Sequence, residues 1–338
     1  MCGICGWIDW DGSADEPAVR RMSERLAHRG PDGSGLWRDP AGLAVLGHRR
    51  LAVLDTSERA HQPMVHASGL VLVFNGEVYS FPEIRRELEA EGVTFASTGD
   101  TEVVLAALAR WGVAALDRFV GMFALALWDP GRRRLLLVRD RFGIKPLFIG
   151  SVPRGLAFAS EVPSVLAHPM VSRDIDRNAI ARWLQQGYPS GRTTLAKGVW
   201  RLPPGHLLEA EDGRTSVRPW YNLLERVQPC GEEQVGDADE RLADLLREAV
   251  RCRLVSDVPL GCCLSGGVDS TAVVAAAAAA GARPETLTVS FAGGDDESPA
   301  ARRTAQARGL DHASGRCTPA GMLEGFAGGP RIAGDPLA

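Results

Sequence analysis

The stretch Met1-Cys2-Gly3-Ile4-Cys5-Gly6 decides how the rest of the chain is interpreted. Cys2 precedes a glycine, and a small second residue permits removal of Met1. Removal would give Cys2 a free α-amine of pKa about 7.7–8.0 beside a thiol of pKa about 8.5. That amine could accept the thiol proton near neutral pH, as an N-terminal amine does for a threonine nucleophile. The sequence therefore predicts Cys2 as a nucleophile and Cys5 as a buried thiol of the first strand.

Cys2 and Cys5 also form a C-x-x-C pair, which is found in zinc and redox sites. Zinc would require a second cysteine pair or two histidines at matching spacing. Cys262 and Cys263 are adjacent, and the seven histidines are scattered. A thioredoxin-like redox pair belongs at a strand-to-helix turn rather than at this position. We therefore expect no metal at this pair.

The composition is that of a soluble globular protein. The 338 residues are 45% hydrophobic and 24% charged, with a formal net charge of −4, which excludes disordered and fibrous classes. A net-acidic chain without a long basic run is not expected to bind nucleic acid. No uncharged apolar window of about 18 residues predicts a membrane span, and no signal peptide is expected. Seven irregularly spaced cysteines favour a reducing compartment, so we expect a cytoplasmic protein with no membrane partner.

Short apolar runs bounded by turn-forming residues predict strands between residues 42 and 220. Because most runs are continuously apolar rather than alternating, we expect sheets covered on both faces. Helical composition over residues 18–28, 82–91 and 101–116 supplies the covering layers. The expected architecture is two sheets between helices. The runs are Leu43–Leu46, Leu51–Leu54, Leu70–Phe74, Phe123–Trp128, Leu135–Val138, Leu147–Ile149 and Leu156–Ala159.

A polar stretch over residues 228–239 separates this region from a second pattern. That pattern is a helix, a strand, a glycine turn, an alanine-rich helix and another strand, which is typical of a parallel α/β unit. The predicted elements span residues 238–254, 259–264, 268–281 and 286–291, with a further helix over 299–308. The predicted domain boundaries are 2–210 for the first domain, 211–237 for a linker and 238–338 for the second domain.

Polar residues follow the apolar run that ends at Phe74. A strand that stops at Asn75-Gly76 would present an amide and a backbone N–H, and both groups can donate to an oxyanion. An ordinary tight turn is the structural alternative. Arg50, Glu77 and Asp100 would suit an amino-acid zwitterion, because arginine binds carboxylate and acids bind ammonium. Arg49 is an adjacent alternative to Arg50, and Asp100 could instead cap a helix.

The loop Ser265-Gly266-Gly267-Val268-Asp269-Ser270 lies between a predicted strand and a predicted helix. Glycines let backbone N–H groups face outward, and a helix N-terminus carries partial positive charge, so the loop predicts an anion site. It is not a Walker A loop, because no Gly-Lys-Ser/Thr follows. A tight turn with Ser265 or Asp269 capping the helix is the structural alternative.

Seven motifs occur in this order along the chain: Met1–Ile4, His28–Asp32, Gly47–Leu51, Asn75–Tyr79, Gly99–Val103, Gly121–Ala124 and Arg139–Leu147. This ordered set resembles the glutaminase domain of glutamine-hydrolysing asparagine synthetases over about residues 2–210. The resemblance implies an α+β N-terminal-nucleophile hydrolase sandwich (αββα) in which Cys2 attacks the glutamine side-chain amide and releases ammonia. It implies that Arg50, Glu77 and Asp100 bind glutamine, with Asn75 and Gly76 forming the oxyanion hole.

The segments Asp257–Gly261 and Ser265–Ser270 are similar to the pyrophosphate (PP) loop of the same family's ATP-binding domain. The resemblance implies that ATP and Mg²⁺ are used to adenylate aspartate, which ammonia then converts to the amide. Glutamine, aspartate and ATP are the implied partners, in an enzyme that can be a homodimer. Asp269 would also hold the metal. The implied ATP-binding residues are Leu264, Ser265, Gly266, Gly267, Asp269, Ser270 and Val289.

The sequence departs from this family in its second half. The family's second signature, of the Ser-Gly-Glu-Gly-x-Asp-Glu type with a following Phe-Gly-Gly-Tyr, does not occur before Ala338. We therefore expect a partial ATP-binding domain. The alternatives to a complete asparagine synthetase are a glutaminase alone, an amidotransferase acting on another carboxylate, and an inactive paralogue.

Overall fold

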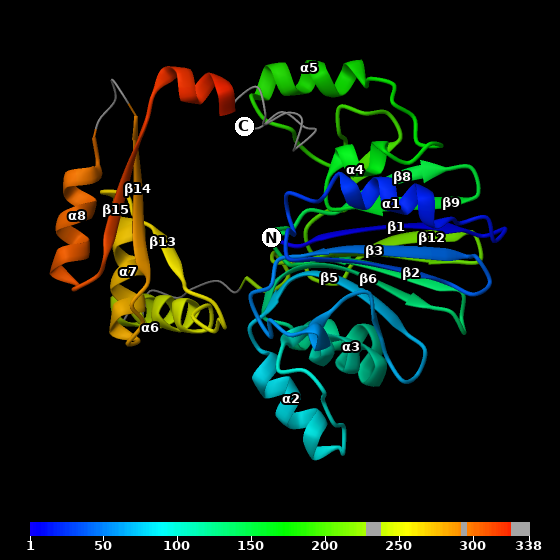
Figure 1. Ribbon diagram of the computed structural model, residues 1–338, viewed down its shortest axis with the longest axis horizontal. Helices are drawn as coiled ribbons and strands as arrows, with labels where there is room; N and C mark the ends of the chain where they lie inside the picture. Colours follow the sequence, from blue (N-terminus) through cyan, green and yellow to red (C-terminus); the bar gives the residue numbers. More distant parts are fainter. Residues whose placement is uncertain (228–237, 292–295, 326–338) are drawn as a thin grey trace. The chain divides into compact units, whose positions relative to one another are not determined.

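The computed structural model describes residues 1–227, 238–291 and 296–325 (Figure 1). The chain divides into two compact units, the first spanning Met1–Arg226 and the second beginning at Val227. The predicted linker residues 228–237 and the end of the predicted second domain, 326–338, lie outside the described residues. The predicted boundary at residue 210 falls within a strand, and the first unit continues beyond it.

Two six-stranded sheets form the centre of the first unit, and all their pairings are antiparallel. The first sheet has the order β10-β8-β9-β1-β3-β2, and the second has the order β12-β11-β7-β6-β5-β4. The strands of the first sheet are β1 (Gly3–Asp9), β2 (Gly33–Arg38), β3 (Ala44–Arg50), β8 (Phe148–Val152), β9 (Gly155–Ala159) and β10 (Val199–Arg201). Those of the second are β4 (Met64–Val65), β5 (Val71–Val78), β6 (Gly121–Asp129), β7 (Arg134–Arg139), β11 (His206–Glu211) and β12 (Arg214–Pro219).

Helices cover the outer face of each sheet (Figure 1). α1 (Glu16–Glu24) and α4 (Val162–Leu166) contact the first sheet, and α3 (Asp100–Trp111) contacts the second, with α2 (Phe81–Ala90) packed on α3. The predicted αββα sandwich is therefore confirmed. The remaining helices of this unit are α5 (Arg177–Gln186) and the 3₁₀ segments Glu58–Ala60 and Gly112–Arg118.

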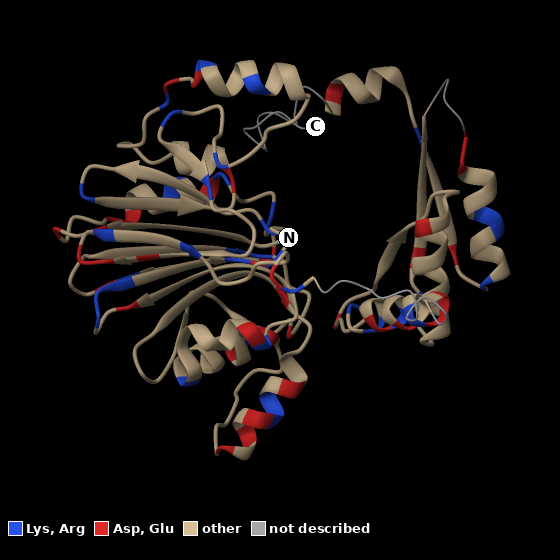
Figure 2. Cartoon of the chain, turned by 180° about the vertical axis from the view of Figure 1, so that it is seen from behind, with Lys and Arg blue, Asp and Glu red and all other residues tan. Residues whose placement is uncertain are grey.

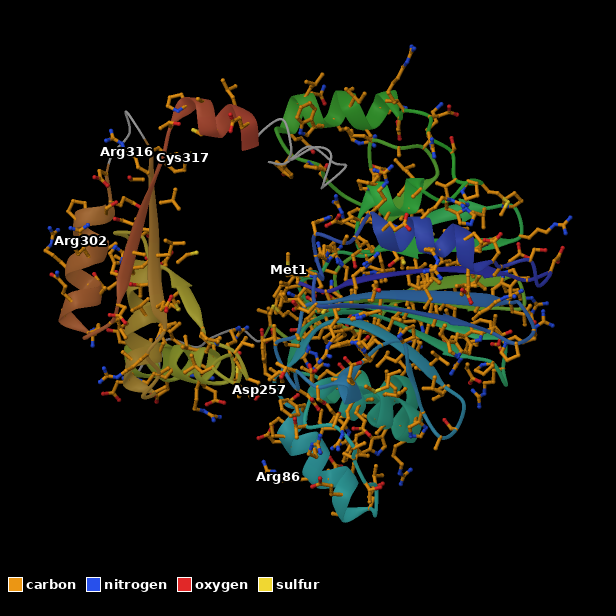
Figure 3. The ribbon with its side chains drawn as sticks, in the orientation of Figure 1. Met1, Arg86, Asp257, Arg302, Arg316 and Cys317 are labelled. Atoms are coloured by element: carbon orange, nitrogen blue, oxygen red, sulfur yellow. The ribbon has the colours of Figure 1, made fainter. Side chains whose placement is uncertain are left out.

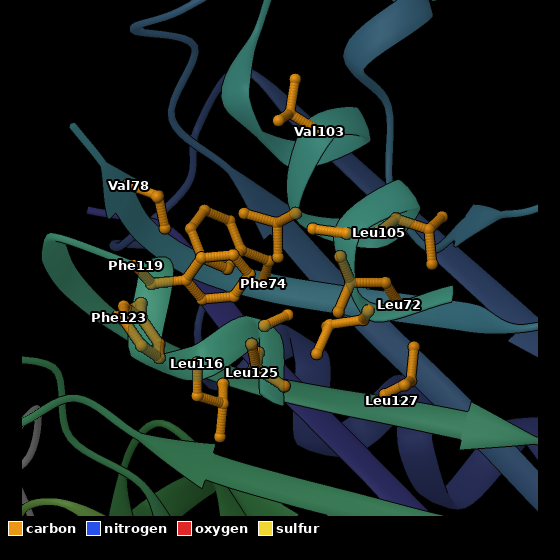
Figure 4. Packing of buried hydrophobic residues seen from close by; sticks show 14 of the residues in the cluster. Leu72, Phe74, Val78, Val103, Leu105, Leu116, Phe119, Phe123, Leu125 and Leu127 are labelled. Atoms are coloured by element: carbon orange, nitrogen blue, oxygen red, sulfur yellow. The ribbon is translucent and has the colours of Figure 1, made fainter. Parts of the chain in front are cut away.

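The continuous apolar runs reflect burial on both faces of each sheet. In β5, Leu72 and Phe74 pack in the cluster between the second sheet and its helices (Figure 4), whereas Val71 and Val73 pack between the two sheets. Successive strand residues point to opposite faces, so a strand covered on both sides needs apolar residues at every position. A third cluster, which includes Cys5, lies between the first sheet and α1.

Two local predictions differ from the structure. The apolar run Leu51–Leu54 is not a strand, because β3 ends at Arg50, and three of its four residues line a cavity instead. β5 does not stop at Asn75-Gly76 but continues to Val78. Gly76 pairs with Phe123, and a side chain at Gly76 would come within 2.2 Å of the Met122 carbonyl oxygen. The glycine therefore marks a close approach between two strands rather than a turn.

The second unit contains a parallel three-stranded sheet in the order β13-β14-β15. The predicted α/β succession is confirmed, but β15 was not predicted because His312–Cys317 contains no apolar run. Figure 2 shows acidic and basic residues along the first helix of this unit, α6. No helix in the described residues is long and apolar enough to cross a bilayer. The elements are α6 (Ala238–Arg251), β13 (Gly261–Cys263), α7 (Val268–Ala279), β14 (Glu285–Phe291), α8 (Ser298–Ala307) and β15 (His312–Cys317).

Candidate active site beside β1

A cavity of about 210 Å³ lies at the end of the strand layers where Met1 is labelled in Figure 3. Pockets for drug-sized ligands are larger, about 300–1,000 Å³, so this volume suits a small metabolite. The cavity brings together every predicted residue of the first site. Those residues are Cys2, Arg50, Asn75, Gly76, Glu77 and Asp100.

The Cys2 thiol is held against the backbone of Leu51. The Leu51 N–H donates to Sγ over 3.4 Å, and Sγ lies 3.6 Å from the Leu51 carbonyl oxygen, to which the thiol can donate. Burial raises the pKa of the thiol, while the Leu51 N–H and the Met1 α-amine act in the opposite direction. Activation of this thiol therefore requires a base and nearby positive charge.

Arg29 fixes the backbone of Cys2. Its Nε donates to the Cys2 carbonyl oxygen over 2.8 Å, and its Nη1 pairs with the Glu161 carboxylate over 2.8 Å. The Arg29 and Glu161 side chains are both buried, so the pair is well shielded from water. A buried charge that loses its partner is strongly destabilising, so this pair holds the nucleophile in a fixed position. The sequence analysis quoted Arg29 in a motif but assigned it no role.

Asn75 presents a donor without a partner. The residue is 1% exposed, and its amide nitrogen Nδ2 hydrogen-bonds to nothing in the described residues. Buried polar atoms are usually paired, so an orphaned donor in a cavity wall indicates a position where a ligand acceptor binds. Together with the backbone N–H of Gly76, it could stabilise an oxyanion that develops beside Cys2.

Two side chains that the sequence analysis did not single out support Asn75 through its neighbour Phe74. Gln62 Oε1 accepts from the Phe74 N–H over 2.6 Å, and the His48 ring nitrogen Nε2 lies 3.2 Å from the Phe74 carbonyl oxygen. Burial lowers the pKa of His48 to about 3, so the ring is neutral and can donate this hydrogen bond. Both backbone groups preceding Asn75 are thus held by side chains.

The structure separates the two adjacent arginines. Arg49 points to α1, where its Nε donates to the carbonyl and hydroxyl oxygens of Ser23. Arg50 lines the cavity and donates to the carbonyl oxygens of Asp55 and Ser57. These two contacts use part of its five N–H donors, and the others can bind a ligand carboxylate.

Asp100 and Glu77 form the acidic side of the cavity. Asp100 Oδ2 accepts from the Val78 N–H over 2.9 Å, which ties the start of α3 to the end of β5. Burial raises the pKa of Asp100 to about 7, and the neighbouring Glu77 acts in the same direction, whereas backbone N–H donors oppose it. A bound ammonium group would relieve this energetic cost by pairing with the two carboxyl groups.

Lys145 also lines the cavity, although the sequence analysis gave it no role. It is 6% exposed and belongs to the segment between β7 and β8. Burial lowers the pKa of its ammonium group, with Arg29 acting in the same direction and Glu77 opposing it. The cavity wall therefore contains two basic and two acidic side chains.

The predicted anion loop of the second unit lies between β13 and α7. Ser265 Oγ accepts from the Gly267 N–H over 3.2 Å, and the Ser265 and Ser270 hydroxyl oxygens are 2.8 Å apart. Gly267 is the N-cap of α7 without a side-chain cap hydrogen bond, and Gly266 is exposed. The helix N-terminus therefore offers backbone donors to an anion.

The other predicted ATP-site residues differ in exposure. Leu264 is buried in a small apolar cluster; its N–H donates to the Leu287 carbonyl oxygen, and its carbonyl accepts from the Thr288 hydroxyl. Its contact with ATP stays a prediction. Val289 is 52% exposed on β14, and Asp269 is exposed in the first turn of α7. No cluster of three metal-ligating residues occurs in the described residues. One carboxylate beside substrate phosphates is nevertheless a usual Mg²⁺ environment.

Comparison with known proteins defines the class. The family described as "Glutamine amidotransferase domain" matches residues 1–221, and the family described as "Asparagine synthase" matches residues 241–337. The first match covers most of the chain, so the chain belongs to the glutamine amidotransferase family, joined to an asparagine synthase segment.

Among individual relatives, the chain is 36% identical over 283 residues to Asparagine synthetase [glutamine-hydrolyzing] 3 of Bacillus subtilis, covering 81% of this chain and 45% of that protein. It is 35% identical over 334 residues to a putative asparagine synthetase [glutamine-hydrolyzing] of Mycobacterium bovis, covering 92% and 51%. The chain thus spans about half the length of these curated relatives. A solved structure of the allosteric regulatory enzyme of purine biosynthesis shares the fold, with a TM-score of 0.51 at 14% identity, covering 94% of this chain and 80% of that one.

Proposed function

We propose that this chain hydrolyses glutamine at Cys2 and supplies the ammonia for synthesis of asparagine from aspartate and ATP. The observation that carries the proposal is one cavity lined by the Cys2 thiol, the unpaired Asn75 amide, Arg50 and two carboxyl groups. This arrangement is complementary to an α-amino acid whose side-chain carbonyl lies beside the thiol. The asparagine synthetase names of two relatives support the choice of product.

The proposed glutaminase chemistry proceeds in two stages. After removal of Met1, the α-amine of Cys2 takes the thiol proton and sulfur attacks the amide carbon of glutamine. Asn75 and Gly76 donate to the oxyanion, and the carbon–nitrogen bond breaks as the amine returns its proton to the leaving ammonia. Water then hydrolyses the thioester and releases glutamate. Arg50, Glu77 and Asp100 orient the amino-acid end of the substrate throughout.

The second unit is proposed to bind ATP at the loop from Ser265 to Ser270. Exposed backbone donors at the start of α7 would hold phosphate oxygens, and Asp269 would hold Mg²⁺. Bound ATP would supply an adenylate leaving group on the aspartate side chain, which ammonia replaces. We also propose a cytoplasmic location, which the free thiols of the six described cysteines support.

The test combines intact-mass analysis with a glutamate-release assay. We expect 6-diazo-5-oxo-norleucine to add one adduct at Cys2 of a chain that has lost Met1, and Cys2→Ala to abolish both the adduct and glutamate release. Cys5→Ala is the matched control, because Cys5 is buried outside the cavity. An unmodified chain that retains Met1 and releases no glutamate would refute the glutaminase proposal.

A separate measurement tests the synthetase half. Aspartate-dependent pyrophosphate release from ATP supports an asparagine synthetase. Glutamate release without that activity means that this chain functions as a glutaminase, and pyrophosphate release that requires another carboxylate identifies a different amide product.

A further inference from the structure

Lys145 is unusual in this chain by composition as well as by position. Only two of the 38 basic residues are lysines, Lys145 and Lys197, and the others are arginines. Lys197 is exposed, whereas Lys145 is 6% exposed and lines the same cavity as Cys2. Lysine carries a compact charge on a flexible stem, whereas arginine spreads its charge over a planar fork. The cavity therefore contains a concentrated charge that the rest of the chain almost never uses.

The backbone of Lys145 is held rigidly. Asp140 is fully buried, and its Oδ2 accepts from the Lys145 N–H over 2.9 Å and from the Phe123 N–H over 3.2 Å. Arg139 Nε donates to the Lys145 carbonyl oxygen over 2.9 Å. Both backbone groups of Lys145 are thus tied to buried charged side chains. A site residue that acts through its charge requires this kind of support.

The ammonium group itself is left available to the cavity. Within the described part of the chain, no oxygen atom hydrogen-bonds or forms an ion pair with Lys145 Nζ, whereas Arg29, another buried cation beside Cys2, pairs with Glu161. Burial is the main cause that lowers the pKa of the Met1 α-amine, with Arg29 and Lys145 acting in the same direction and Cys2 opposing them. Met1 lines the same cavity as Cys2 and Lys145, so an α-amine created on Cys2 by removal of Met1 would lie in the same cavity as the Lys145 ammonium group. An amine must be unprotonated to act as a base.

We propose that Lys145 is a positioning residue for the nucleophile, whose ammonium charge keeps the α-amine unprotonated and stabilises the Cys2 thiolate without contacting glutamine. This inference rests on the proposed glutaminase function and adds a residue to it. No bond to Lys145 forms or breaks; the thiol proton still moves to the α-amine. The other charged groups that act on the thiol, the amine or Lys145 are Arg29, Asp32, Arg50, Glu77, Asp100 and Asp140.

The test follows alkylation of Cys2 by iodoacetamide as a function of pH in the full chain, mapped by mass spectrometry. Lys145→Met removes the charge, Lys145→Arg keeps it, and Lys197→Met is the matched surface control. We expect Lys145→Met to move the alkylation profile about 0.5–1 pH unit higher, in the direction that loss of a nearby cation dictates. Lys145→Arg should restore most of the shift, and Lys197→Met should leave the profile unchanged. Identical profiles for Lys145→Met and Lys197→Met would overturn the proposal.

Steady-state kinetics separate this role from substrate binding. Lys145→Met should lower kcat at pH 7 about 3–10-fold, the loss of unprotonated base expected from that shift, with little change in KM for glutamine. A change confined to KM would mean that Lys145 contacts the substrate, and the proposal would be wrong. The alkylation profile is measured without glutamine. A wild-type chain that releases no glutamate would therefore refute the proposed function while the Lys145 comparison could still be read.

The wild-type chain offers a measurement that does not depend on a variant folding. Biosynthetic incorporation of [ε-¹³C]lysine labels only Lys145 and Lys197, so NMR can follow both titrations. We expect the Lys145 signal to show a protonated amine at pH 7. A Lys145 signal that is already unprotonated at pH 7 would exclude the charge that the proposal requires.

Discussion

Asn75 keeps a buried amide nitrogen unpaired among the described residues. An unsatisfied buried donor costs about 1–3 kcal/mol, and such a cost is tolerated where a ligand supplies the missing acceptor. We therefore predict that Asn75→Ala lowers kcat for glutamate release about 10²–10³-fold, the range found for loss of one oxyanion donor. The melting temperature should change little, because no described hydrogen bond of Nδ2 is removed. Steady-state assays and thermal melts measure the two effects.

The half-buried Asn222 provides the control for this experiment, because Asn222→Ala removes an amide outside the cavity. Its kinetic constants should match those of the wild-type chain. If Asn75→Ala instead raised KM while kcat stayed constant, Asn75 would bind ground-state substrate and would not stabilise the oxyanion.

Asp100 should show a trade-off between stability and function. Its folded pKa of about 7 lies above the ordinary value of about 3.9. The folded state therefore binds the proton more tightly, so this contribution to stability is full below about pH 4 and is lost as pH rises through 7. Asn cannot ionise, so Asp100→Asn should unfold at higher urea concentration than wild type at pH 8, by roughly 1–3 kcal/mol, with no gain at pH 4.

The same substitution should weaken glutamine binding, since it removes a negative charge that faces the substrate ammonium. Urea unfolding at both pH values and KM for glutamine are the measurements. Glu24→Gln, at an exposed carboxyl group on α1, should change neither quantity. An Asp100→Asn variant less stable than wild type at pH 8 would contradict the conclusion that burial raises the pKa of Asp100 and so costs stability when the carboxyl group ionises.

Motifs in the sequence indicated the residues that face the substrate, whereas the residues that support them left no signal. Arg50 was preferred to Arg49 from the motif alone, and the structure gives the physical reason, because alternate residues of β3 face opposite sides of the sheet. Gln62 and His48 act on Phe74 across sequence separations of 12 and 26 residues. Contacts of this kind depend on strand register, which no local pattern reveals.

At the scale of elements, the end of the β5–β6 ladder positions the oxyanion donors. A side chain at Gly76 would lie 2.2 Å from the Met122 carbonyl oxygen and 2.6 Å from the Phe123 Cα, and these backbone atoms cannot move aside cheaply. We predict that Gly76→Ala lowers the free energy of unfolding by about 1–3 kcal/mol through overpacking. Glutamate release should fall with it. Urea unfolding and the glutaminase assay measure both effects.

Gly131 provides the comparison, since a Cβ there meets nothing closer than 3.4 Å. Gly131→Ala should leave both measurements within error of wild type. If the two alanine variants were equally stable, β6 would be able to move away from Gly76. The close approach of β5 and β6 at Gly76 would then not be what positions the oxyanion donors.

The strands that the sequence predicted correctly are those in which a continuous apolar run is buried on both faces of a sheet. β5, β6 and β7 are apolar on both faces because helices cover one side and the other sheet covers the second. Leu51–Leu54 has the same composition, but it encloses the cavity with irregular backbone. β15 is mostly exposed and polar, and only its parallel pairing with β14 makes it a strand. Amino-acid composition indicates whether a segment is buried. It does not show whether the segment pairs in a sheet or encloses a cavity.

At the scale of the whole molecule, the core and the candidate glutaminase site belong to one unit. The three large hydrophobic clusters and all residues lining the cavity lie within residues 1–226. The described clusters of the second unit are small, with five buried members in one and three in the other. Since apolar burial is the main favourable contribution to folding, stability should be concentrated in the first unit.

We therefore predict that residues 1–226 alone fold cooperatively, form the Cys2 adduct with 6-diazo-5-oxo-norleucine and release glutamate with kcat within about threefold of the full chain, a difference of less than 1 kcal/mol in barrier height. Circular dichroism melts establish folding, and adduct stoichiometry counts competent sites. The fragment carrying Cys2→Ala is the control. A fragment that melts cooperatively but releases glutamate more than tenfold more slowly would mean that the second unit helps to order the cavity, since Cys2, its proposed base and every binding group are already present in the fragment.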